Sequence, residues 1–307
     1  MNEVLPTDQL LAHLELDSEP PSYDYLRRLM LAYRERVPYE NASRLLRYRD
    51  IRNPDARVRL PQHVWQESMS IGSGASCSDG TYAFKKLLDA LGFEVKLVIN
   101  SEGKVQRDKA DQVLDFPREP AHCSILAHVE GQRYVVEACS VNIVKVPLPI
   151  GLPYRVDVTG HTDEGQAFHY AAEPLGDNYF ELHNIGPDGF KFIAGEPLVG
   201  SPKRGQMYIF SSRPVSDADF EDYMRWAYHK GYSSQHLSFV CRHPDSKVEH
   251  RFSTFSGRLW RNDTGSWEQM ALGQDVAATL AEVSGLPYER LKGGLEYLET
   301  KQKVSPK

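Results

Sequence analysis

The sequence has few cysteines and no long apolar run, and each absence excludes a class of protein. Its 307 residues include four irregularly spaced cysteines, Cys77, Cys123, Cys139 and Cys241. A disulfide framework would need more of them, so we expect a reducing compartment, the cytoplasm. No window approaches the roughly 18 apolar residues that predict a membrane-spanning helix, and the acidic N-terminal segment lacks the features of a signal peptide. No membrane partner is therefore expected.

Basic residues are too few and too dispersed for a nucleic-acid-binding surface. The chain carries 36 lysines and arginines against 42 acidic residues, a net charge of −6. No basic cluster is long enough to follow a phosphate backbone, so we expect no nucleic-acid partner. Internal repeats and low-complexity segments are also absent. The length fits one large domain or two to three small ones, and 41% hydrophobic residues suffice for a sizeable core.

The periodicity of apolar residues changes twice along the chain. Residues 1–92 carry apolar stripes at helical spacing, and Val37-Pro38 ends one of them because a residue before proline avoids the helical conformation. From about 93 to 205, short alternating segments predict a β-sandwich or barrel. Residues 206–307 predict a helix capped by Ser216, then strands, then two short helices.

The segment Ser73–Gly80 carries the strongest functional signal. In it, Cys77 follows a turn of small residues and precedes an amphipathic run that Gly92 brings to an end. Cys77 is therefore predicted at or near a helix N-terminus, where unpaired N–H groups and the positive end of the helix dipole favour a thiolate. A thiolate is the nucleophile that acyl-transfer chemistry needs.

A cysteine nucleophile needs a base, and the base needs an orienting acid, for which His122 and Glu137 are the candidates. Glu130-Gly131 separates two apolar segments and predicts a β-hairpin. As a two-residue loop it places His122 opposite Cys139, and a register shifted by two places His122 opposite Glu137. Side chains alternate along a strand, so both registers put His122 and Glu137 on one face, at most a diagonal of roughly 7–8 Å apart.

Taken singly, each of these residues fits a structural role, since a lone cysteine is usually a small buried hydrophobe. A metal site is another interpretation of the same region. However, His122-Cys123, His128 and Cys139 match no zinc-ligand spacing, and strand alternation sends Cys123 to the face opposite His122. We therefore expect a catalytic set, Cys77, His122 and Glu137, and no metal.

Several segments match, in order and spacing, the motifs of one known family. Val37–Asn41 resembles its (I/V)-P-F-E-N element, and the approach to Cys77 occupies the place of its R-G-G-x-C motif. His122 and the strand ending at Glu137 stand where the family has a catalytic histidine and aspartate. Ser233–Phe252 resembles its N-x-x-x-S…H-P-x-S-x-F region. The chain thus resembles the arylamine N-acetyltransferase family nearly from end to end.

The resemblance implies an α+β fold of three domains with a papain-like catalytic core. Residues 1–92 would form a helical bundle carrying the nucleophile, and 93–205 a β-barrel carrying the histidine and the acid. Residues 206–307 would form an interdomain helix and an α/β lid. The implied activity is a ping-pong transfer of an acetyl group from acetyl-coenzyme A to a small aromatic amine or hydrazine through an acyl-cysteine.

Three departures from the family pattern bear on this expectation. Ser73 stands in place of the family arginine, so Glu40 is expected to lack a cationic partner. Glu137 replaces an aspartate, and glutamate can also orient an imidazole. The glycine-rich loop that lets the family's backbone approach coenzyme A is Ala138-Cys139-Ser140 here, and these three residues are expected at the cofactor site.

The altered loops leave two alternatives open. One is a family relative that uses another acyl donor, such as an amide synthase or amidase-like enzyme. The other is a non-catalytic relative that keeps the fold as a binding module.

Overall fold

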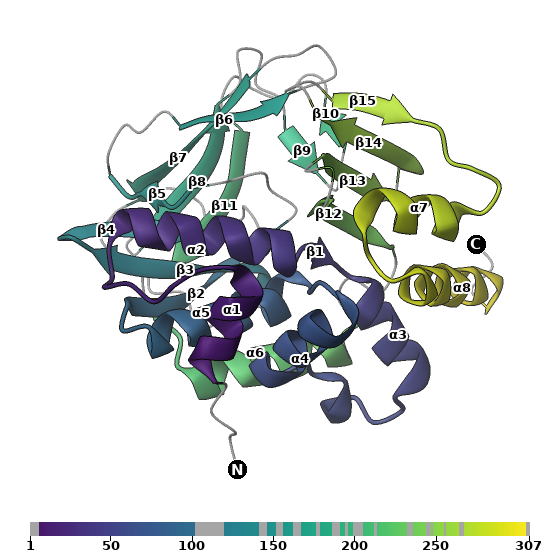
Figure 1. The fold of residues 1–307 in the computed structure, drawn as a ribbon, viewed down its shortest axis with the longest axis horizontal. Coiled ribbons are helices and arrows are strands. Elements are labelled where there is room, and N and C mark those ends of the chain that lie inside the picture. The colour runs from purple at the N-terminus through teal and green to yellow at the C-terminus, as the bar shows by residue number, and fades with distance from the viewer. Residues whose placement is uncertain are drawn as a thin grey trace.

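The computed structural model describes fifteen stretches of the chain, and the statements below concern these stretches. They are residues 6–101, 120–140, 146–151, 156–161, 167–175, 179–185, 191–193, 196–198, 205–211, 214–231, 236–243, 246, 248–254, 256–263 and 267–304. Figure 1 shows a group of helices at one side of a large sheet, with a smaller sheet and two C-terminal helices beside them.

The N-terminal part is helical, as predicted. Its elements are α1 (Thr7–Leu14), α2 (Tyr23–Arg36), α3 (Ala42–Asp50), the 3-10 helix η1 (Asp55–Arg57), α4 (Pro61–Ile71) and α5 (Cys77–Ala90). The predicted apolar stripe of α2 is fully buried, and the helix ends at Arg36, just before Val37-Pro38. Helix α6 (Asp217–His229) packs with this group, and the Ser216 hydroxyl accepts the backbone N–H of Asp219 as its cap.

The central part forms an eight-stranded antiparallel sheet in the order β5-β4-β3-β2-β11-β8-β7-β6. The strands are β2 (Glu94–Ser101), β3 (Pro120–Val129), β4 (Gln132–Val136), β5 (Leu148–Pro149), β6 (Val156–His161), β7 (Ala167–Leu175), β8 (Tyr179–Ile185) and β11 (Gly205–Ser211). A bridge between Ile150 and Ala172 brings the β5 end of the sheet toward β7. Among the described strands the ladder does not close into the barrel that the middle third predicts. Strands β9 (Lys191–Ile193) and β10 (Glu196–Leu198) form a separate two-stranded sheet.

The C-terminal part contains a second sheet to which the N-terminal part contributes a strand. Its order is β1 (Tyr39–Glu40), β12 (Ser238–Arg242), β13 (Glu249–Ser253), β14 (Arg258–Asn262) and β15 (Trp267–Met270). Helices α7 (Val276–Ser284) and α8 (Tyr288–Val304) complete this part. A separate apolar cluster, including Leu237, Phe252 and Leu291, joins the sheet to α3, α7 and α8.

The arrangement agrees with the predicted α+β fold. The domain limits at residues 92 and 205 stay predictions, and β11 runs across the second of them. In the predicted third-domain motif, Ser233, Pro244 and Asp245 lie outside the described residues.

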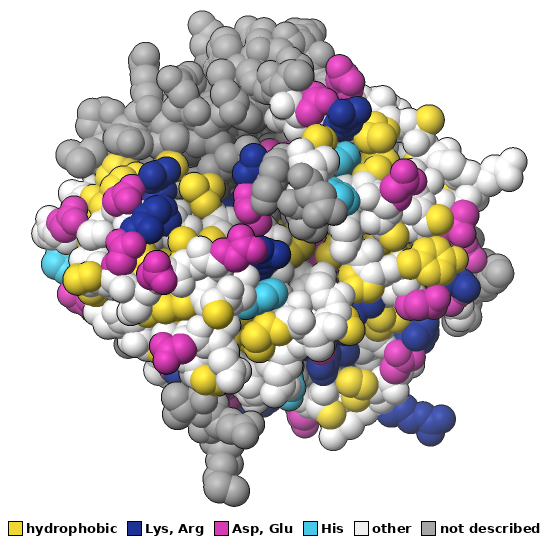
Figure 2. All heavy atoms as spheres, viewed as in Figure 1, with side chains coloured by type: hydrophobic (Ala, Val, Ile, Leu, Met, Phe, Trp, Pro, Cys, Tyr) yellow, Lys and Arg dark blue, Asp and Glu magenta, His cyan; other side chains and the backbone are white. Residues whose placement is uncertain are grey.

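Figure 2 shows acidic and basic side chains intermixed over the described part of the face in view. No described helix is long and apolar enough to cross a membrane.

Replacing Gly80 in α5 with alanine is predicted to destabilise the protein. A Cβ added there would overlap the Cys139 sulfur and lie 2.7 Å from the Cys139 Cβ. Although alanine is the better helix former, Gly80→Ala should lower the free energy of unfolding by about 1–3 kcal/mol through overpacking. Thermal melting measures the loss.

The matched control is the same change in a Cys139→Gly background, where the two nearest atoms are absent and only the Ala75 Cβ, at 3.2 Å, stays close. There Gly80→Ala should raise the melting temperature relative to Cys139→Gly alone. Stabilisation by Gly80→Ala in both backgrounds would show that the predicted overlap does not exist.

Candidate active site

The N-terminus of α5 positions Cys77, and a tightly packed turn leads into it. The turn is held by the strand that precedes α3: Ala75 N–H donates to the Pro38 carbonyl at 2.9 Å, and Glu40 N–H donates to the Ala75 carbonyl at 2.8 Å. A Cβ at Gly74 would overlap the Pro38 oxygen and lie 2.8 Å from the Glu40 Cγ, so the close approach requires glycine. Cys77 is partly exposed, whereas the other three cysteines are buried.

The predicted hairpin between β3 and β4 is confirmed, with Val129 paired to Gln132. Its two loop residues, Glu130-Gly131, have φ angles of 52° and 77°, the left-handed pair that a tight hairpin turn requires. His122 and Glu137 lie beyond the last regular pair, and they meet across the sheet. The His122 Nε2 and the Glu137 Oε2 are 2.7 Å apart, and both side chains are buried. The diagonal relation expected from the sequence therefore exists.

The three candidate residues perturb one another's pKa values. A hydrogen bond from the Cys123 thiol lowers the pKa of Cys77 well below its ordinary value, against the effect of burial, and a hydrogen bond with His122 lowers it further. Burial alone would lower the pKa of His122, but the Glu137 carboxylate and the Cys77 sulfur raise it to about 10. Burial likewise opposes ionisation of Glu137, and His122 outweighs it and lowers that pKa. The arrangement favours a thiolate, an imidazolium and a carboxylate in contact.

Cys123 lies beside the nucleophile as well as His122, a contact that sequence reasoning missed. The pairing of β2 with β3 shifts by one residue between Ile99–Cys123 and Ser101–Pro120, so that Ala121 and His122 together stand opposite Asn100. The register therefore keeps His122 and Cys123 on alternate faces of β3. Both side chains nevertheless hydrogen-bond with the Cys77 sulfur. No group of residues suited to a metal ion occurs in the described part of the chain.

The predicted cofactor-site residues divide into two kinds. The Cys139 thiol donates to the carbonyls of Ala75 and Ser76 at 3.3 and 3.4 Å, so it packs behind the nucleophile's turn. Ala138 and Ser140 instead face a cavity of about 60 Å³. The remaining residues around that cavity are Leu31, Arg34, Glu35, Tyr39, Val240, Cys241, Arg242 and Glu249. Only two of the three predicted side chains therefore border open space.

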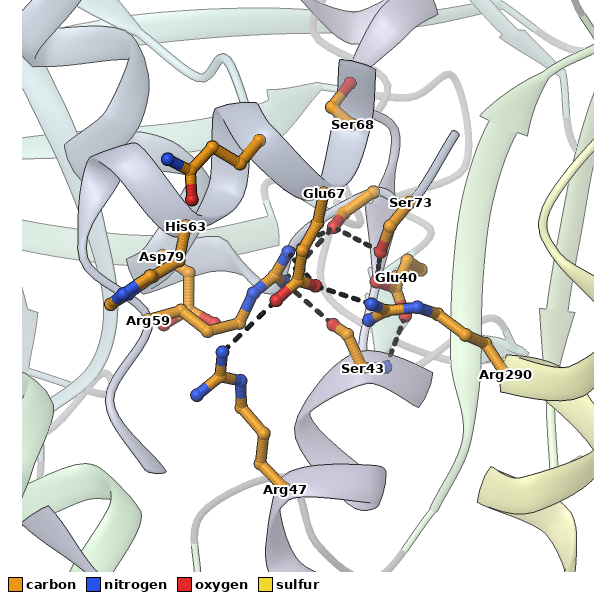
Figure 3. A network of polar contacts seen from close by, with 12 residues as sticks. Glu40, Ser43, Arg47, Arg59, His63, Glu67, Ser68, Ser73, Asp79 and Arg290 are labelled. Carbon is orange, nitrogen blue, oxygen red and sulfur yellow. Dashed lines mark hydrogen bonds and ion pairs between the residues drawn. The ribbon is translucent and has the colours of Figure 1, made fainter. Parts of the chain in front are cut away.

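The sequence predicts that Glu40 lacks the family's cationic partner, and a buried arginine from another segment, Arg59, reaches its surroundings without a direct ion pair between the two (Figure 3). The Glu40 carboxylate accepts the backbone N–H of Ser43 at 2.9 Å and the hydroxyl of Ser73 at 3.4 Å. Arg59 donates to the hydroxyl of that same Ser43 at 2.8 Å. Burial alone would lower the pKa of Arg59, but the carboxylates of Glu67, Asp79 and Glu40 raise it.

Asp79, in the first turn of α5, holds a second polar group around the nucleophile. Its carboxylate accepts the hydroxyls of Ser76 at 2.8 Å and Tyr228 at 3.0 Å. The Arg44 guanidinium stacks on the Tyr228 ring, 4.1 Å from its centroid. Sequence reasoning missed these residues. Asp79 could have been found from its position, because it stands three residues after Ser76 at a predicted helix start, where an acidic residue often caps the helix.

A family model described as N-acetyltransferase matches residues 22–287. The chain belongs to the arylamine N-acetyltransferase family. It is therefore an enzyme of the acyltransferase class. The match covers α2 to the segment before α8, and thus includes the site described above. Comparison with curated proteins finds no match.

Solved structures of arylamine N-acetyltransferases share the fold. The enzyme from Nocardia farcinica has a TM-score of 0.67 and 18% identity, covering 96% of this chain and 95% of its own. The enzyme from Salmonella typhimurium has a TM-score of 0.66 and 17% identity, covering 94% and 97%. The Bacillus cereus enzyme, described as having a unique Cys-His-Glu catalytic triad, has a TM-score of 0.62 and 14% identity, covering 93% and 99%.

Alkylation by iodoacetamide should modify Cys77 before the other cysteines. Its pKa is lowered, whereas burial raises the pKa of Cys139 and of Cys241, and burial together with the Cys77 sulfur raises that of Cys123. At about pH 6 an ordinary thiol is more than 99% protonated, so only a pre-formed thiolate reacts at an appreciable rate. Peptide mapping after brief labelling of the folded protein identifies the site.

Cys77→Ala is the control and should leave the folded protein nearly unlabelled. Faster labelling of any other cysteine under native conditions would contradict the assignment of Cys77 as the reactive thiol.

Proposed function

We propose that the protein transfers an acetyl group from acetyl-coenzyme A to a small aromatic amine or hydrazine by a ping-pong mechanism. Cys77 acts as the nucleophile, His122 as the base and Glu137 as the acid that orients it. One observation carries the proposal: a thiol of lowered pKa at a helix N-terminus shares a buried site with a histidine 2.7 Å from a carboxylate. Family membership supports the reaction class.

In the first half-reaction the Cys77 thiolate attacks the thioester carbonyl carbon. Backbone N–H groups at the start of α5 point toward the developing oxyanion and stabilise it. The carbon–sulfur bond of coenzyme A then breaks, and the leaving thiolate takes the proton of the His122 imidazolium. An acetylated cysteine and a neutral imidazole remain.

In the second half-reaction the amine attacks the acetyl-cysteine carbonyl and gives its proton to the neutral His122. Collapse of the tetrahedral intermediate releases the Cys77 thiolate and the N-acetyl product. The imidazolium and thiolate with which the cycle began are restored. Glu137 stabilises the imidazolium in both directions, and the Bacillus cereus relative described as having a Cys-His-Glu triad supports glutamate in this role.

The pocket beside Ala138 and Ser140 is the proposed entry for the coenzyme. Both residues face the cavity, and its wall carries two guanidinium groups that could meet a polyanionic ligand, Arg34 and Arg242, beside two carboxylates, Glu35 and Glu249. Arg242 contacts Glu35 at 2.6 Å, so Arg34 is the main cation of this proposal. The Arg34 guanidinium also donates to the Glu137 carbonyl at 2.9 Å, which joins the cavity to the site. All four cysteines are free, and this supports a cytoplasmic location.

Intact-mass spectrometry after mixing with acetyl-coenzyme A alone tests the proposal. A single acetyl adduct that is absent in Cys77→Ala and is discharged by an arylamine is expected. A folded protein without an adduct would contradict acetyl-coenzyme A as the donor. Acylation of Cys77 by an activated ester would then favour a relative with another acyl donor. No acylation by either compound would favour a binding module.

Glu137→Gln should reduce kcat/KM by about 100-fold or more, because the amide cannot stabilise the imidazolium. The pKa of His122, about 10 in the intact site, should fall, since burial lowers it and the carboxylate that raises it is gone. Wild-type alkylation of Cys77 should stay nearly constant from about pH 9 to pH 6, whereas in the variant it should fall over that range. Stopped-flow alkylation measures both profiles.

Glu137→Asp, with the family's usual residue, is the matched control and should be the milder change. Equal activity and equal pH profiles for the wild type and Glu137→Gln would remove Glu137 from the mechanism.

Restoring glycine at Ala138 should lower the apparent KM for acetyl-coenzyme A and leave the acylation rate at saturation nearly unchanged, because this side chain borders the cavity. Glycine at Ser140 should lower KM as well, but it also removes a side chain that hydrogen-bonds Glu137. Burst acylation with acetyl-coenzyme A and with a p-nitrophenyl ester, in both forms of the loop, measures the effect. A burst with the ester and none with the coenzyme in either form would contradict acetyl-coenzyme A as donor.

A further inference from the structure

Arg59 is a fully buried cation, and its contacts converge on the turn that carries the nucleophile. Its side chain is 0% exposed. Both terminal nitrogens donate to the Gly74 carbonyl, each at 3.1 Å. One of them also donates to the Ser43 hydroxyl at 2.8 Å, and the other contacts the Glu67 carboxylate at 3.1 Å. Burying a guanidinium is costly, so this arrangement persists only because these partners replace water.

The Gly74 carbonyl is the contact that links Arg59 to chemistry. Gly74 lies three residues before Cys77, and the turn between them has no freedom to adjust, since Gly74 is pressed against Pro38 and Glu40. The Ser73 hydroxyl also donates to this carbonyl, at 3.3 Å. The guanidinium therefore tethers the turn on the side of α4, beside a backbone hydrogen bond from Ser73 N–H to the Glu67 carbonyl at 3.3 Å.

We propose that Arg59 is a positioning residue for the Cys77 nucleophile. Its guanidinium fixes the turn at Gly74, and through it the first turn of α5, at the distance from β3 at which Cys77 meets His122. The inference rests on the proposed function only for the identity of the reacting thiol. A displacement of about 1 Å at a reacting group can cost two orders of magnitude in rate, so the tether has a direct kinetic consequence.

The network around Glu67 separates positioning from stability (Figure 3). Glu67 accepts three guanidinium groups: Arg47 at 3.1 Å, Arg59 at 3.1 Å and Arg290 at 2.7 Å. Loss of one leaves the carboxylate paired with two others. Arg47 contacts Glu67 and the carbonyls of Ala56 and Arg57 but neither Gly74 nor Ser43. Arg47→Gln therefore removes a more exposed ion pair to the same carboxylate and no direct contact with the turn.

The experiment compares Arg59→Gln, Arg59→Lys and Arg47→Gln in the full chain. The readouts are the rate and pH profile of Cys77 alkylation by iodoacetamide, together with kcat and KM for an arylamine. Arg59→Gln should slow alkylation at neutral pH about ten-fold or more and raise the pH at which the thiolate forms, because Cys77 no longer meets His122. It should lower kcat with little change in KM. Arg47→Gln should stay within about two-fold of the wild type.

Arg59→Lys keeps the charge, but an ammonium cannot bond Gly74, Ser43 and Glu67 in one plane. The alkylation rate of this variant should therefore lie between those of Arg59→Gln and the wild type. Arg59→Lys carries the test if Arg59→Gln does not fold. An Arg59 variant that melts at a lower temperature but keeps the wild-type alkylation profile would overturn the proposal and leave Arg59 a structural residue. Alkylation needs no acyl donor, so wild-type protein that fails to accept acetyl from acetyl-coenzyme A would contradict the proposed function without affecting this comparison.

Discussion

Three ionisable side chains meet at one site in this protein, and the charge of each depends on its neighbours. Glu137 is 2% exposed and His122 is 4% exposed, so neither carries a charge at low cost by itself. The carboxylate holds a proton on the imidazole, and the imidazolium in turn favours the Cys77 thiolate. Removal of one member therefore shifts the pKa of the group that it contacts. The surrounding structure can therefore be understood as the means of keeping three groups at contact distance.

Two kinds of scaffold keep that distance. His122 and Glu137 come from one hairpin, whose register is set locally by the turn at Glu130-Gly131. A slip of one residue would send His122 to the other face of the sheet, so the turn chemistry fixes the base–acid pair. Cys77 has no such local reference. Its position depends on the turn at Gly74, which Pro38, Glu40 and Arg59 clamp from different segments of the chain.

The same distinction explains what could be predicted from the sequence. The helix that starts at Cys77, the stop at Gly92 and the hairpin loop all follow from rules that act over a few residues. The hydrogen bond between Cys123 and the Cys77 sulfur could not be predicted, because strand alternation does not say which side chains a neighbouring helix meets. The role of Arg59 could not be predicted, because this residue lies in an irregular segment and its partners, at separations of 8 to 16 residues, belong to α3, α4 and the turn before α5. The thiol of Cys139 points at α5 because Gly80 leaves room for it, which no local pattern of Ala138–Ser140 encodes.

The two-residue strand β1 has a consequence for how the chain acquires this site during synthesis. Tyr39 and Glu40 bridge the nucleophile's turn at Ala75 on one side and pair with Val240 and Phe239 on the other. Asn41 adds two bonds to the same distant segment, through the His236 carbonyl and the Ser238 N–H. A chain emerging from the ribosome therefore holds the early segment with an unpaired edge until about 200 further residues have been made. The helical part and the C-terminal sheet mature together, so the reactive thiol gains its final surroundings only after translation is nearly complete.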